Sequence, residues 1–172
     1  MTIFLILLLI VVIIWLTYAY FKMTINDILD KLVVLDKIFD SRYNDLTKAI
    51  AQFQKYMPEH SNLIFDIQKS KADAAKVAKP KTTQELAQKI MNENALTINI
   101  NFLIDKCDFK NIHPDLKIIV DKQVEYIQKI GATANEYNKL ITNYKTLKTI
   151  FPFSLYTKMI GINLDLDIIK TE

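Results

Sequence analysis

Residues 2–21 read TIFLILLLIVVIIWLTYAYF and contain no charged residue, histidine, proline or glycine. We call this stretch the apolar segment. A helix needs about 20 apolar residues to cross a hydrocarbon core about 30 Å thick. Trp15, Tyr18 and Tyr20 gather toward its end, as aromatic rings do in the headgroup layer, and Lys22 follows directly. The sequence therefore predicts a transmembrane helix with these four residues at the membrane surface.

Two other interpretations of the first 21 residues fit less well. A cleaved signal peptide has a positively charged start, a shorter apolar run and a cleavage site made of small residues, and TYAYFK offers no such site. A helix buried in a soluble core is rarely apolar on every side. We therefore assign residues 1–21 to a transmembrane anchor.

The orientation of the anchor is predicted from the basic residues that flank it. No lysine or arginine precedes the apolar segment, whereas Lys22, Lys31 and Lys37 follow it closely. Because basic residues favour the cytoplasmic side, the sequence predicts a single-pass protein of the inner (cytoplasmic) membrane. Its N-terminus would lie outside and its C-terminal domain in the cytoplasm.

The overall composition excludes several classes of protein. The chain has 22 basic and 19 acidic residues, and a net charge of +3 is too small to argue for a nucleic-acid partner. Cys107 is the only cysteine, so no intrachain disulfide can form. Two glycines and four prolines in 172 residues are too few for an architecture rich in strands and turns.

Apolar residues recur at steps of three and four along most of the remaining chain, which is the spacing of one buried helix face. Between Lys22 and Pro58 neither proline nor glycine occurs, so the first helix can continue the anchor as one rod. Within residues 95–104 an alternating pattern also suits a strand, but we favour helix because a lone strand would have no partner. We thus predict an all-α chain in which residues 22–161 form an elongated antiparallel up-and-down bundle, with a tail at 162–172. The predicted helices are about 22–57, 59–78, 83–107 and 114–150.

In the last predicted helix three aromatic residues lie seven residues apart. Tyr137, Tyr144 and Phe151 share the stripe of Ile127, Ile130 and Ile141, so we expect them to face the other helices. A ligand pocket lined by these rings and by Phe153 is the alternative.

This pattern resembles the LemA family of bacterial membrane-anchored helical proteins. In that family an Ile, two Tyr-Asn pairs and a Phe-Pro pair follow one another at intervals of seven. Here they correspond to Ile130, Tyr137-Asn138, Tyr144-Lys145 and Phe151-Pro152, and His113-Pro114-Asp115-Leu116-Lys117 is similar to a second family motif. Asn44, Thr47 and Lys145 depart from the family pattern, so the chain would be a divergent member. The resemblance implies membrane anchoring, a helical domain and partner binding beside membrane proteases and envelope stress systems, with no defined activity.

Candidate chemistry is sparse. Cys107 with His113 is the only nucleophile and base pair, and no motif supports it. Together with Asp105 and Asp108 these residues fit no common zinc spacing. The two glycines stand alone, so no phosphate-binding loop is present. We therefore expect no enzymatic activity, metal or cofactor.

The main hypothesis is a membrane-anchored, non-enzymatic interaction or scaffold protein. Its partners would be the lipid bilayer, other membrane or cytoplasmic proteins, and a second copy of itself. The candidate interaction residues are Tyr137, Asn138, Tyr144, Phe151 and Pro152. The alternative is a ligand- or lipid-sensing module that uses the aromatic core or the basic turn at Lys69–Lys81.

Overall fold

The computed structural model describes residues 2–77 and 83–160, and in this part of the chain every regular element is a helix. The all-α prediction is therefore confirmed. The elements are α1 (Thr2–Tyr56), a short 3-10 turn η1 (Pro58–His60), α2 (Ser61–Ala75), α3 (Thr83–Asp105), α4 (Pro114–Leu147) and α5 (Phe153–Ile160).

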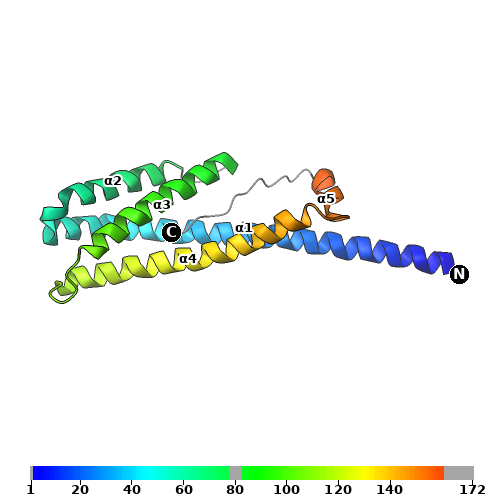
Figure 1. Ribbon diagram of the computed structural model, residues 1–172, viewed down its shortest axis with the longest axis horizontal. Helices are drawn as coiled ribbons and strands as arrows, with labels where there is room; N and C mark the ends of the chain where they lie inside the picture. The colour runs from blue at the N-terminus through cyan, green and yellow to red at the C-terminus, as the bar shows by residue number, and fades with distance from the viewer. Residues whose placement is uncertain (1, 78–82, 161–172) are drawn as a thin grey trace.

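Consecutive long helices run antiparallel beside one another (Figure 1). Helix α1 extends along the whole length of the molecule, α2 turns back along it, α3 reverses again, and α4 returns beside α1 toward the apolar segment. Helix α5 lies where α4 ends, against α1. This is the elongated up-and-down bundle that the sequence predicts.

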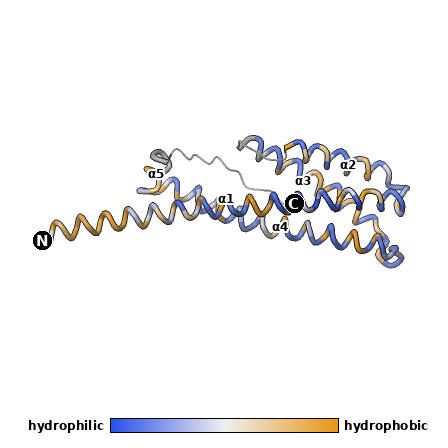
Figure 2. The backbone as a smooth tube through the Cα atoms, turned by 180° about the vertical axis from the view of Figure 1, so that it is seen from behind, coloured by the Kyte–Doolittle hydropathy of each residue, from blue (hydrophilic) through white to orange (hydrophobic). Residues whose placement is uncertain are grey.

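Helix α1 is unbroken from Thr2 to Tyr56 because no proline or glycine interrupts it before Pro58. Its first part carries apolar side chains on every side and projects beyond the other helices, as the hydropathy colouring in Figure 2 shows. This helix is long and apolar enough to cross a membrane. The apolar segment and the first bundle helix therefore form one continuous rod.

The core is divided into two clusters along the rod. In the first, residues of α1 near Phe53 pack against α2, α3 and the start of α4. In the second, the middle of α1 packs against α4 and α5. The second cluster contains Phe21, Ile25, Ile28, Leu35, Phe39, Ile130, Ala134, Tyr137, Ile141, Tyr144 and Tyr156.

The helix boundaries differ from the predicted ones by a few residues. Residues 95–104 are helical as expected, since the buried side chains of Leu96, Ile100 and Leu103 follow a step of four and then three. Helix α4 begins at Pro114 as predicted, and the ring of His113 accepts a hydrogen bond from the Asp115 backbone N–H. It ends at Leu147 instead of residue 150. The predicted helix 59–78 is the turn η1 followed by α2, and the predicted tail lies outside the described residues.

Candidate functional site

Cys107 and His113, the pair considered for chemistry, each have a structural partner. The Cys107 thiol is buried 3.6 Å from the sulfur of Met57, and burial raises its pKa. The His113 ring caps α4 and stacks on Tyr56 with 4.4 Å between ring centroids. A cleft of about 270 Å³ lies between these groups at the end of the bundle opposite the apolar segment. Among the described residues, no three His, Cys, Asp or Glu side chains are placed to share a metal ion.

The basic turn is tied to the bundle where the structure describes it. The Lys76 ammonium contacts Asp73 at 2.6 Å, and Lys71 donates to the hydroxyl of Thr47 on α1. The Lys79 and Lys81 part of the turn lies outside the described residues.

Helix α5 docks directly on the apolar segment of α1. The Tyr156 hydroxyl donates to the backbone carbonyl of Ile14 and lies 2.9 Å from the Thr17 hydroxyl. The Tyr156 ring meets Tyr18 edge-on with 5.6 Å between centroids. Tyr156 therefore holds the C-terminal helix to the last turns of the apolar segment, where the sequence places the membrane surface.

Further rings extend this contact to α4. Phe21 is fully buried, stacks on Tyr144 at 5.6 Å and lies 6.0 Å from Phe153. The Tyr20 hydroxyl accepts a hydrogen bond of 3.3 Å from the Asn143 amide. We call the whole group the aromatic cluster: Tyr18, Tyr20, Phe21, Tyr144, Phe153 and Tyr156.

The residues predicted to bind a partner do not share one surface. Tyr137 and Tyr144 are buried, as expected for the packed face, and Asn138 and Pro152 are partly exposed. Phe151 is 75% exposed, so the prediction that it faces the other helices is wrong. Since α4 ends at Leu147, the helical periodicity stops one turn before Phe151.

The residues predicted at the membrane surface lie at the level of the aromatic cluster. All four are exposed, and two of them also contact other helices. Tyr18 meets Tyr156 of α5 edge-on, and the Tyr20 hydroxyl accepts the hydrogen bond from Asn143 of α4. Phe153 was among the rings of the ligand-pocket alternative, but Tyr156 was not predicted to take part in a site. Its spacing of three from Phe153 on a short amphipathic helix is a recognisable signal.

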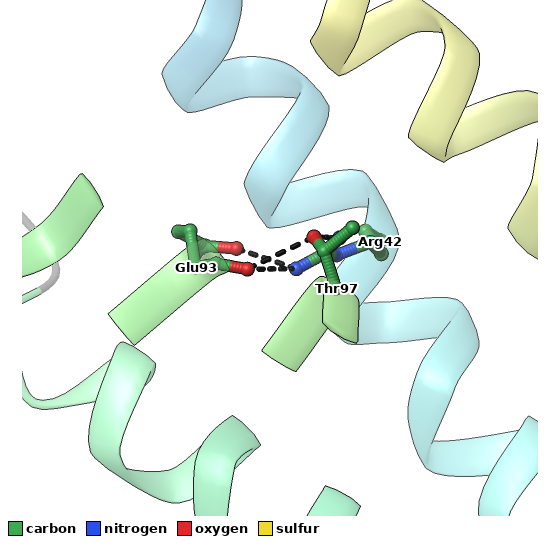
Figure 3. Close-up of polar contacts among 3 residues, drawn as sticks. All are labelled: Arg42, Glu93 and Thr97. Atoms are coloured by element: carbon green, nitrogen blue, oxygen red, sulfur yellow. Dashed lines mark hydrogen bonds and ion pairs between the residues drawn. The ribbon is translucent and has the colours of Figure 1, made fainter. Parts of the chain in front are cut away.

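A set of buried polar side chains joins α1 to α3 (Figure 3). The guanidinium of Arg42, 0% exposed, donates to the Glu93 carboxylate at 2.7 Å and to the Thr97 hydroxyl at 2.8 Å. One helical turn away on α3, the buried ammonium of Lys89 pairs with Asp36 of α1. We call these five residues the ionic seam.

Burial and charge act against each other in the ionic seam. Desolvation lowers the pKa of Arg42 and raises the pKa of Glu93 to about 7, although each partner favours the charged form of the other. Within the described structure, Nε of Arg42 and Oε1 of Glu93 have no hydrogen-bond partner. The ionic seam therefore fixes how α1 packs against α3, and burying its charged groups costs a large desolvation free energy.

Comparisons of this chain with protein-family models, with curated proteins and with solved structures found no match.

Proposed function

We propose that this protein is a membrane-anchored, non-enzymatic helical interaction protein. The observation that carries the proposal is the exposure of residues 3–16, whose fourteen apolar side chains are each 44–75% exposed. Patches of this size on soluble proteins mark contacts with a membrane or a partner. Transferring these side chains from water into the apolar interior of a bilayer would lower the free energy by on the order of tens of kcal/mol.

The domain that follows the anchor supports a binding role. On α1, beyond the apolar segment, Leu29 and Val33 are exposed one turn apart. They present an apolar edge to which a helix of another protein or of a second copy can pack. Cys107 and His113 are occupied with packing and capping, which favours binding over catalysis. The resemblance to LemA proteins extends this proposal to a role beside membrane protein quality control or envelope stress systems.

The same proposal includes an orientation. Because Lys22, Lys31 and Lys37 follow the apolar segment closely, the proposed orientation has the N-terminus outside and the bundle in the cytoplasm of an inner-membrane protein.

A lipid-sensing function is the second candidate. It is favoured by the docking of α5 on the apolar segment, because a change in the bilayer at that level would act on Tyr156 and on the aromatic cluster.

The anchor and its orientation can be tested in one strain. Phe109 is exposed in the α3–α4 loop, so we choose Phe109→Cys combined with Cys107→Ala, which removes the buried thiol. The protein should stay in the membrane pellet after washing with high salt. A membrane-impermeant maleimide should label Cys at position 109 only after the cells are opened.

Two matched variants control this experiment. A chain without residues 2–16 should leave the pellet and remain helical by circular dichroism. A Thr2→Cys variant should be labelled in intact cells. Salt-resistant pelleting of the shortened chain would contradict the anchor, and labelling of position 109 in intact cells would reverse the orientation.

The binding surface can be tested by photocrosslinking in cells. A benzophenone amino acid at Val33 should give discrete adducts, at twice the chain mass for self-association or at other masses for other partners. Ile118 on α4 is the matched control, since it is an exposed apolar residue far from this surface. Equal adducts at both positions, or none at Val33, would count against this surface.

A further inference from the structure

The position of α5 along α1 fixes its depth if α1 spans a membrane. An α-helix rises 1.5 Å per residue, so Ile14 lies about 10 Å from Phe21 along the axis of the rod. A span needs about 20 residues and therefore takes up nearly all of the apolar segment. Since the Tyr156 hydroxyl is hydrogen-bonded to the carbonyl of Ile14, which directly precedes Trp15, α5 lies beside the end of the apolar segment, at the boundary between headgroups and acyl chains.

Three large apolar side chains are exposed on the first turn of α5 and the turn before it. Phe151 is 75% exposed, and Ile150 and Leu155 are 48% and 47% exposed. We call these three residues the apolar patch. In water they would be an unusual group of neighbouring exposed apolar side chains, but at the boundary between headgroups and acyl chains such residues are stable.

The charge around the patch has one sign. Residues 137–160 contain four lysines and no acidic residue, and residues 2–26 contain Lys22 and no acidic residue. Among the described side chains of these two ranges, the charged ones are Lys22, Lys139, Lys145 and Lys148, which are all basic. Lysines near the membrane surface attract anionic lipid headgroups. An acidic protein partner would have to reach the same depth and displace those headgroups.

We propose that the apolar patch inserts into the leaflet facing the bundle, as a second lipid contact beside α1, with the lysines at anionic headgroups. This inference rests on the proposed function, because it requires α1 to span the bilayer. Lipid is favoured over a protein partner because Tyr156, next to Leu155 in the chain, holds α5 against the apolar segment itself.

The experiment uses the full chain in nanodiscs that contain anionic lipid. A Phe151→Cys variant in a Cys107→Ala background is labelled with an environment-sensitive fluorophore. Quenching is measured with nitroxide lipids and with aqueous iodide. Phe65→Cys is the matched control, since Phe65 is 64% exposed on α2, away from the apolar segment. Trp15, the only tryptophan, reports on α1 in the unlabelled protein.

We expect nitroxide lipid to quench the label at position 151 several-fold more than the label at position 65, and iodide to show the opposite order. Trp15 should also be quenched by the lipid. If Trp15 is quenched but position 151 behaves like position 65, the patch faces water or a protein and the inference fails while the anchor stands. If Trp15 is not quenched, the proposed anchoring fails, and the inference with it.

Discussion

Replacing Arg42 with alanine should lower the free energy of unfolding by about 3–5 kcal/mol, the usual cost of removing one partner from a buried ion pair. The change leaves the Glu93 carboxylate buried without its cation and the Thr97 hydroxyl without its donor. Since a domain of this size has about 5–15 kcal/mol of stability, the melting temperature measured by circular dichroism should fall sharply.

Two further variants separate the cost of leaving the Glu93 carboxylate buried without a cation from the loss of the ion pair itself. The double variant Arg42→Met with Glu93→Leu should recover most of the lost stability, because apolar residues of similar volume often replace a buried pair without loss. Lys31→Ala removes a partner from the exposed pair with Glu136 and should lower the melting temperature far less, because solvent screens exposed ion pairs. A melting temperature for Arg42→Ala equal to that of Lys31→Ala would show that the ionic seam is not a structural element.

Replacing Tyr144 with alanine should cost about 3–5 kcal/mol, as is typical when a buried aromatic ring is truncated to leave a cavity. Tyr144 is 1% exposed and stacks on Phe21, so its removal opens the contact between α4 and the rod. Thermal melting of the detergent-solubilised full chain measures the effect.

Phe151→Ala is the matched control, because Phe151 follows Tyr144 by seven residues in the same aromatic repeat but is exposed. It should shift the unfolding free energy by no more than about 0.5 kcal/mol, the usual range for surface positions. Similar losses for the two variants would mean that Phe151 is packed after all.

The sequence predicts the helices well because its signals there are local. A three-four stripe and a proline at each boundary act within a few residues, and Pro114 led to the correct start of α4. Residues 95–104 are the exception, because their alternating pattern also suits a strand and helix was favoured only for want of a partner strand. The end of α4 was misplaced because the stripe continues to Phe151 and neither glycine nor proline occurs between Leu147 and Pro152 to mark the end of the helix. Periodicity alone cannot show where a helix ends.

The ionic seam and the docking of α5 could not be predicted because both depend on distant pairings. Arg42 follows Phe39 by three residues and precedes Leu46 by four, so it lies on the buried face of the helix. A charged residue at such a position indicates that a partner of opposite charge lies nearby. Nothing local identifies Glu93, 51 positions away, as that partner. Thr17, likewise, is a polar residue in an apolar segment whose contact comes from 139 positions further on.

The unbroken α1 also makes the protein a lever. Its 55 residues give a rod about 80 Å long, of which the last 35 reach about 50 Å from the bilayer if the apolar segment spans it. Transmembrane helices tilt by about 20° on average, and a tilt of that size moves the far end sideways by about 18 Å. A partner that binds the far end can therefore change the tilt of the helix in the bilayer without touching a lipid.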